Sequence, residues 1–242
     1  MRFLLLGLVV PHAPALLPEV RGEADALPPL HVERPDCAVL LSPHGASTGV
    51  YRSVAGDLDG FGVEGLGVTR QTDADLCARL AERWGQPLLD EPCDHGVVVP
   101  LIAGWVPDVP IVACALAEVT GPDAAPVPSA IGAARGFAAA LASLTEDRTV
   151  VFVASAHTSA ALTPRAPLTL RDEGLVLEEE IKDALESDLG KLDSLSPELW
   201  TLGGSCGAGP LTALGLLFTG SKASVGFYDH PFGVGYLLAE VG

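Results

Sequence analysis

Apolar runs of strand length, separated by stretches of helical periodicity, constrain the fold of this chain more than any other feature of its sequence. Most of the runs are continuously hydrophobic rather than alternating, which is typical of strands covered on both faces of a sheet. Strands that alternate with helices predict an α/β fold, with a mainly parallel central sheet and helices on both of its faces. The predicted strands are residues 3–10, 37–41, 109–115, 149–154 and 223–228.

Helical patterns fill the intervals between these strands. We expect helices over residues 73–84, 129–144, 171–189 and 207–218, with Ser129 as the N-cap of the second. The Pro-rich stretch 119–128 is interpreted as a surface connection, because regular patterns resume on both sides of it. The sequence shows no internal repeat, and its 242 residues fit one α/β domain spanning residues 1–242.

Charge and cysteine usage narrow the classes of function. Lys and Arg number 14 against 31 Asp and Glu, and the resulting net charge of -17 repels phosphate backbones, so we expect no nucleic-acid partner. No apolar run reaches the ~18 residues of a membrane span. The apolar opening is followed by Pro-His-Ala-Pro instead of a small-residue cleavage site. The five cysteines include no CxxC pair, which is typical of free thiols in a reducing compartment. Together these features predict a cytoplasmic protein with no membrane contact.

The placement of the histidines is the most informative feature for function. His12, His44 and His157 each come just after a predicted strand, and His95 precedes the apolar residues 97–101. The ligand crevice of an open α/β sheet lies beyond the carboxyl ends of its strands. We therefore expect the first three side chains to converge on one edge, with His95 joining them from a loop. The remaining two of the six histidines, His31 and His230, are assigned no role.

A shared pocket of histidines suits a metal ion, although any one of them alone is more often a hydrogen-bonded structural residue. Prolines precede His12 and His44, and their fixed φ stiffens the approach to each imidazole. Two histidines with one carboxylate or thiolate form a common open site for Fe(II), and the same ligand types hold zinc. Spacing alone does not separate the two metals.

Six short motifs, in order along essentially the whole chain, resemble the class III extradiol dioxygenase superfamily. That superfamily includes the LigB-type catalytic subunits and the Memo-like proteins. The motifs are Pro-His-Ala-Pro at 11–14, Leu-Ser-Pro-His-Gly at 41–45, Asp-His-Gly-Val-Val-Val-Pro-Leu at 94–101, Leu-Thr-Pro-Arg-Ala-Pro at 162–167, Ser-Cys-Gly at 205–207 and Pro-Phe-Gly-Val-Gly-Tyr at 231–236.

The resemblance implies a mononuclear Fe(II) bound by His12 and His44, with His95 lining the substrate pocket. The family usually carries its acid/base histidine at the place of Ala160, so His157 is the candidate to replace it, provided that its loop turns inward. The third ligand of the family is often a glutamate at the place of Ser205.

Memo-like members use a cysteine next to that place, which makes Cys206 the candidate third ligand here. A thiolate favours copper or zinc more than a carboxylate would. The other interpretation of Cys206 is that it is a small buried residue at the start of a helix.

Four functions are consistent with this pattern. The first is an extradiol dioxygenase acting on a catechol-type small molecule, and the second is a Memo-like metal-binding protein that has lost ring cleavage. The third is a scaffold or small-ligand binder without metal, and the fourth is a zinc hydrolase. Class III enzymes often associate, so a homodimer is expected by analogy.

Overall fold

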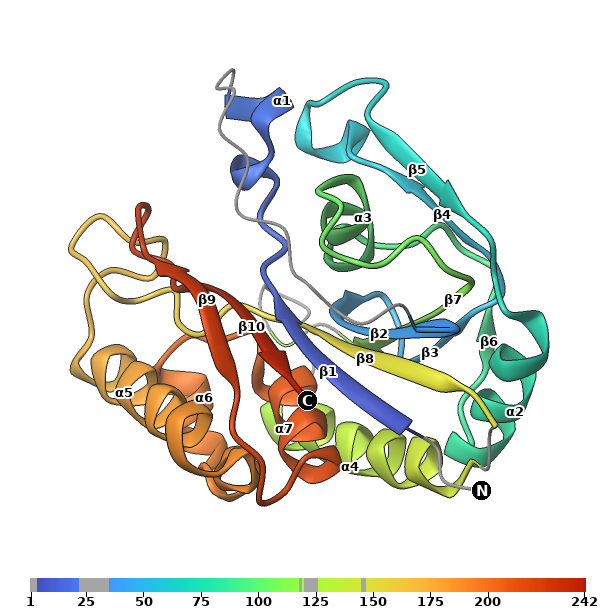
Figure 1. Cartoon of the computed structure of the whole chain (residues 1–242). Helices are drawn as coiled ribbons and strands as arrows, with labels where there is room; N and C mark the ends of the chain where they lie inside the picture. The colour runs from blue at the N-terminus through green and yellow to red at the C-terminus, as the bar shows by residue number, and fades with distance from the viewer. Residues whose placement is uncertain (1–3, 22–34, 118, 120–125, 145–146) are drawn as a thin grey trace.

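An eight-stranded sheet runs through the centre of the computed structural model, which describes residues 4–21, 35–117, 119, 126–144 and 147–242 (Figure 1). The strand order is β6-β3-β7-β2-β8-β1-β10-β9, and β4 and β5 form a separate two-stranded sheet. The strands are β1 (Leu4–Val10), β2 (Cys37–Gly45), β3 (Gly49–Tyr51), β4 (Val54–Asp57), β5 (Gly67–Arg70), β6 (Leu88–Leu89), β7 (Ile111–Ala117), β8 (Thr149–Ser155), β9 (Ser224–Asp229) and β10 (Tyr236–Val241).

The middle of the sheet is parallel, as predicted. β7, β2, β8 and β1 are adjacent and pair in parallel, whereas β10, β9 and the β3–β7 pair are antiparallel. The four central strands are those with continuous apolar sequence, and nearly all their described residues are buried. Their carboxyl ends therefore meet at one edge of the sheet.

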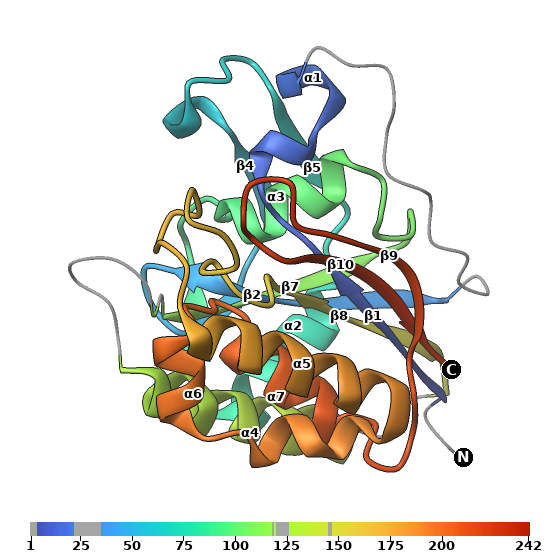
Figure 2. The ribbon, with the colours of Figure 1, turned by 90° about the vertical axis from the view of Figure 1, so that its left-hand side faces the viewer.

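Helices cover the two faces of the sheet unequally (Figures 1 and 2). One face packs against α2 (Ala74–Trp84), α4 (Val127–Ser143), α5 (Asp172–Ser187), α6 (Pro197–Leu202) and α7 (Ala208–Leu217). The other face packs against α3 (His95–Ile102) and the β4–β5 hairpin. The expectation of helices on both faces is confirmed. The shorter helical segments are α1 (Pro18–Arg21) and the 3₁₀ turns η1 (Pro14–Leu16), η2 (Asp59–Phe61) and η3 (Leu189–Ser194).

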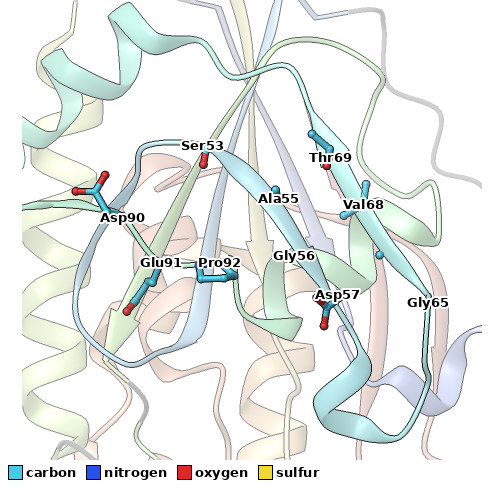
Figure 3. Close-up of a pocket in the computed structure, with 11 residues that line it drawn as sticks. Ser53, Ala55, Gly56, Asp57, Gly65, Val68, Thr69, Asp90, Glu91 and Pro92 are labelled. Carbon is cyan, nitrogen blue, oxygen red and sulfur yellow. The ribbon is translucent and has the colours of Figure 1, made fainter.

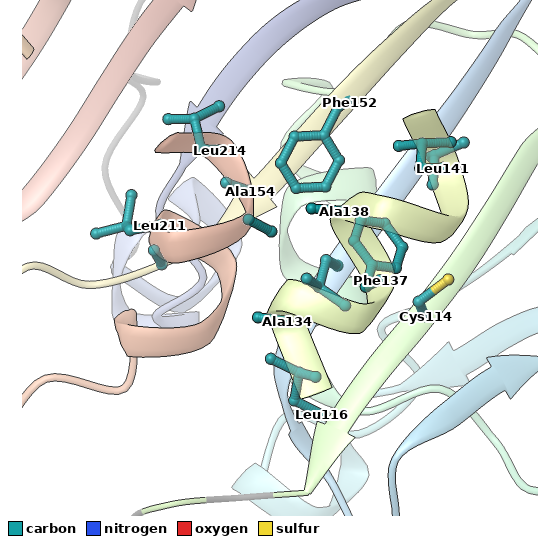
Figure 4. Packing of buried hydrophobic residues seen from close by; sticks show 14 of the residues in the cluster. Cys114, Leu116, Ala134, Phe137, Ala138, Leu141, Phe152, Ala154, Leu211 and Leu214 are labelled. Atoms are coloured by element: carbon teal, nitrogen blue, oxygen red, sulfur yellow. The ribbon is translucent and has the colours of Figure 1, made fainter. Parts of the chain in front are cut away.

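Aromatic rings fill the core between the sheet and α4 (Figure 4). Phe137 of α4 is fully buried, with its ring centroid 5.6 Å from Phe152 of β8 and 5.2 Å from Trp84 of α2. The Trp84 indole N–H donates to the Ala133 carbonyl at 2.9 Å, so its polar atom is satisfied. This packing ties two helices to a central strand.

Two local expectations require correction. Helix α4 begins at Val127 with Pro126 as its N-cap residue, so Ser129 lies inside the first turn. Pro128 is compatible with this turn because a proline there removes an N–H that would have no intrahelical partner. His95 is the first residue of α3, and not part of a loop. Within the described residues, no helix is long and apolar enough to cross a membrane. His31 and most of residues 119–128 lie outside the described part of the chain.

Candidate metal centre

The carboxyl ends of the central strands bring four histidines together, as the sequence predicted. His12 lies two residues beyond β1, and His157 lies two residues beyond β8. His44 stands near the end of β2, and His95 opens α3. His230 lies outside this group, in the turn that follows β9. Cys206 joins the four histidines from the residue before the N-cap of α7. We call His12, His44, His95, His157 and Cys206 the histidine cluster.

His12 is the centre of the cluster. Its Nε2 lies 2.9 Å from the Nε2 of His44 and 3.5 Å from the Cys206 sulfur. Its ring stacks on His157 with centroids 3.9 Å apart, and the His95 centroid lies 5.6 Å away. Nitrogens bound to one tetrahedral zinc are roughly 3.3 Å apart, and a nitrogen and a thiolate sulfur roughly 3.6 Å, given Zn–N bonds of ~2.0–2.1 Å and Zn–S bonds of ~2.3 Å. The spacings around His12 are close to these values.

Two sets of three side chains could hold a metal ion, and both contain His12. The ligand atoms of His12, His157 and Cys206 lie within 4.8 Å of one another, and so do those of His12, His44 and His95. The ligand set expected from the sequence, with His12, His44 and Cys206, takes members from both. A buried group of histidine and cysteine side chains is therefore present that could bind a metal ion.

Ser155 fixes the tautomer of His12. The Ser155 hydroxyl donates to the Gly96 carbonyl at 2.6 Å, so its oxygen is left to accept a proton from His12 Nδ1, at 2.9 Å. With the proton on Nδ1, the Nε2 lone pair faces His44 and Cys206. Metal-bound histidines are commonly oriented by a hydrogen bond of this kind on the other ring nitrogen.

Asp94 holds the elements that carry His44 and His95. One carboxylate oxygen accepts from the Ser42 hydroxyl at 2.5 Å and from the Gly96 N–H at 2.7 Å, which caps α3. The other accepts from the Tyr51 hydroxyl at 2.8 Å. Between Ser42 and Gly45 the register of β2 against β7 shifts, and His44 lies within this irregular stretch. The network thus connects the irregular end of β2 to the start of α3.

Burial and mutual contact set the protonation of the cluster. Burial, followed by the charges of His157, His44 and His95, lowers the pKa of His12 well below its usual value. Burial alone would raise the pKa of the Cys206 thiol, but the charge of His157 and hydrogen bonds from His157 and His44 lower it to about 5. A neutral imidazole and a thiolate are the forms that bind metals, so at neutral pH both side chains are ready to act as ligands.

Ala160 and Ser205, the two positions at which the sequence differs from the family that it resembles, have structural roles. The loop after β8 turns His157 inward, where its Nε2 accepts from the His12 backbone N–H at 3.2 Å, while Ala160 packs against the core. The Ser205 hydroxyl donates to the His157 carbonyl at 2.8 Å and accepts from the Gly207 N–H at 2.9 Å. Ser205 therefore supports the loop that carries His157.

Aromatic side chains that the sequence interpretation missed flank the cluster. The Phe61 ring, on the β4–β5 hairpin, lies 4.8 Å from His95, and the Tyr236 ring lies 5.2 Å from His157. Burial, and after it the Cys206 charge, raises the pKa of Tyr236 to about 12, so its hydroxyl stays protonated. Tyr236 belongs to the Pro-Phe-Gly-Val-Gly-Tyr motif, which was the available signal, whereas nothing in the sequence singled out Phe61.

A surface cavity of about 600 Å³ lies along the β4–β5 hairpin, and its lining includes none of the clustered histidines (Figure 3). Three carboxylates, on Asp57, Asp90 and Glu91, are among its lining residues. A cavity of about 490 Å³ lies between Arg165 and Phe232, and the Phe232 ring is 6.3 Å from Tyr236. Of these two cavities, the smaller one has a lining residue, Phe232, that is connected to the cluster by ring contacts through Tyr236.

Comparison with known proteins gives information on the fold of this chain but not on its chemistry. No protein family and no curated protein matches the chain. Among solved structures, the chain is similar to the crystal structure of uncharacterized protein JW3007 from Escherichia coli K12. The TM-score is 0.61 at 17% identity, covering 98% of this chain and 99% of that chain. At this identity the similarity shows a shared fold over the whole length.

Proposed function

We propose that this chain is a metal-dependent oxidoreductase of the class III extradiol dioxygenase type, acting on a small aromatic molecule. One observation carries the proposal: the His12 Nε2 lone pair is turned by Ser155 toward His44 and Cys206, at 2.9 and 3.5 Å. Two imidazoles and a thiolate at these spacings suit a mononuclear metal.

His12 and His44 would hold the metal, with Cys206 as the third ligand. A ferrous ion bound there would supply a common site for a catecholate and dioxygen. The chain itself supplies the surroundings. Phe61 lies against His95, and Tyr236 lies against His157, so the histidine cluster has aromatic rings on two sides. Such ring surfaces favour a flat aromatic substrate.

His157 and His95 are the side chains of the histidine cluster that would move protons in this reaction. Because the His157 Nε2 accepts from the His12 backbone N–H, the proton of neutral His157 resides on Nδ1, the atom from which it can be donated. His157 also contacts Cys206, so its charge and the thiolate are coupled. His95 lies between Phe61 and His44, where it can contact a bound ring.

A Memo-like protein that binds copper or zinc and has lost ring cleavage is the second candidate. The lowered pKa of Cys206, about 5, favours it, because a thiolate ligand selects softer metals than Fe(II). All five cysteines are free, and a reduced Cys206 is required under either function. We therefore assign the protein to a reducing compartment such as the cytoplasm.

Metal analysis of protein purified without oxygen tests the shared part of both candidates. We expect about one metal ion per chain, and its absence would refute both. Oxygen uptake by the Fe(II)-loaded protein with a panel of catechols then separates the candidates. The native protein, His157→Ala and Ala160→His should be compared with the same catechol. Uptake that collapses in His157→Ala, typically by ~10²–10⁴-fold for a lost acid/base, supports the dioxygenase. An inactive native protein with iron bound supports the Memo-like alternative.

A further inference from the structure

Three buried oxygens without a hydrogen-bond partner among the described residues lie together beside the loop that carries His157. They are the two carboxylate oxygens of Glu178, on α5, and the hydroxyl oxygen of Thr158. Glu178 is 4% exposed and Thr158 is 2% exposed. A Cβ on Gly235 would collide with Thr158 Oγ1 and would lie 2.8 and 3.0 Å from the Glu178 oxygens. The three oxygens therefore face one small space, which exists because residue 235 is a glycine.

Within the part of the chain that the structure describes, no cationic side chain pairs with the Glu178 carboxylate. Lys182 follows Glu178 by one helical turn of α5, but its ammonium lies over the Tyr228 ring, 3.9 Å from the centroid. The Tyr228 hydroxyl is also near the carboxylate, and burial, followed by the interaction with Glu178, raises the pKa of Tyr228. Their contact lacks the geometry of a hydrogen bond, so the carboxylate remains unpaired.

A carboxylate in a protein interior is costly to ionise unless another group compensates its charge, and buried charges are generally paired or bound to a cation. The groups that surround this space offer only oxygen: one carboxylate and the hydroxyls of Thr158 and Tyr228. Hard cations prefer such donors, whereas the imidazoles and the thiolate of the histidine cluster suit transition metals. Because the site carries a single negative charge, a single positive charge balances it.

We propose that Glu178, Thr158 and Gly235 form a second cation site, which binds a monovalent alkali ion, Na⁺ or K⁺. The Glu178 carboxylate supplies the charge, the Thr158 hydroxyl supplies a further oxygen, and the absent side chain of Gly235 leaves the space. The net charge of -17 attracts cations to the protein. Thr158 follows His157 and Gly235 precedes Tyr236, so the ion ties α5 to two segments that flank the histidine cluster. The site is separate from that cluster and does not depend on the proposed function.

Thermal unfolding of the full chain in NaCl, KCl and choline chloride at equal ionic strength tests the site. Choline is too large for a space of this size, so it screens surface charge without binding. We expect an alkali salt to raise the melting temperature above that in choline chloride, and the rise should saturate with concentration. Once the ion is tenfold above its dissociation constant, the difference should reach about 3–6 °C for a chain of this length. Equal melting temperatures in the three salts would overturn the proposal.

Glu178→Gln should abolish the difference between the salts, because it removes the charge and keeps the shape of the side chain. Glu179→Gln is the matched control, since it removes the same charge from the adjacent, exposed position of α5, and it should retain the native difference. Thr158→Val removes one oxygen and keeps the backbone N–H that donates to the Gly235 carbonyl, so it should reduce the difference. An undiminished difference in Glu178→Gln and Thr158→Val, or its loss in Glu179→Gln, would overturn the assignment of the ion to this site.

Discussion

Replacing Ser155 by alanine tests the claim that a single hydroxyl aims the central histidine. Ser155 is fully buried, and its oxygen joins His12 Nδ1 and the Gly96 carbonyl. Without it, His12 is free to carry its proton on Nε2, the atom that faces His44 and Cys206. Loss of such an orienting hydrogen bond typically lowers metal affinity by 10–100-fold. We expect a loss of this size for Zn²⁺, measured by competition with a chromophoric chelator.

The same change must also lower stability, so a matched variant is required. Two buried polar groups lose their partner in Ser155→Ala, and each unsatisfied group costs about 1–3 kcal/mol. Ser159 is equally buried, and its hydroxyl donates to the Gly203 carbonyl at 2.7 Å and accepts from the Ala161 N–H at 3.1 Å. Ser159→Ala should therefore match the loss of unfolding free energy in urea while retaining native Zn²⁺ affinity. Native Zn²⁺ affinity in Ser155→Ala would refute the role of Ser155 in fixing the tautomer.

Three further changes probe the ligands, the core and the charge network. His44→Ala should abolish the binding of one Zn²⁺ per chain, measured after dialysis. Its circular dichroism spectrum should stay native, because the partly exposed ring carries little packing energy. Full metal content would mean that the ion binds elsewhere. Phe137→Ala should lower the free energy of unfolding, measured by urea denaturation, by about 3–5 kcal/mol, because the fully buried ring packs between Trp84 and Phe152. A loss below about 1 kcal/mol would contradict this packing argument. Burial raises the pKa of Asp73, but a backbone N–H and Arg148 more than offset this and lower it. The lowered pKa makes the ionised form stabilising above the ordinary aspartate pKa, and this stabilisation is lost as the pH falls through the lowered value. Asp73→Asn should thus cost about 1 kcal/mol at pH 7 and progressively less in acid, and a cost independent of pH would refute the pairing.

The fold could be predicted from the sequence because its main signal is strong and local. Continuous apolar runs such as residues 37–41 and 149–154 have one stable place, the middle of a sheet covered on both faces. The short strands β3 and β6, of three and two residues, carry no such signal; β3 forms because β7 offers it a pairing edge, and β6 pairs with β3 in turn. One face of the sheet carries more helices than the other. This difference depends on the side of the sheet to which each connection passes, and local periodicity does not contain that information.

The position of the site followed from the same rule, whereas its supporting contacts did not. His12, His44 and His157 lie at the carboxyl ends of three neighbouring parallel strands, so the direction of the strands brings them to one edge. The hydrogen-bond partners of Ser155 lie 59 and 143 residues away along the chain. Those of Asp94 lie between 2 and 52 residues away. Serine and aspartate are common in loops, and only the tertiary structure distinguishes these two from the others.

Ala160 stands where the family that the chain resembles usually carries a histidine, yet an imidazole is present at the cluster. The chain leaves β8 at Ser155, and the loop bends so that residue 157, three positions earlier than residue 160, stacks on His12. The Ser205 hydroxyl donates to the carbonyl of residue 157 at 2.8 Å, and the Thr158 N–H donates to the Gly235 carbonyl at 3.1 Å, so two hydrogen bonds fix the loop. Under the proposed function an acid/base must lie near His12, and residue 157 lies there. An alignment that counts residue 160 as a loss of function would therefore overlook the side chain at residue 157 that contacts the cluster.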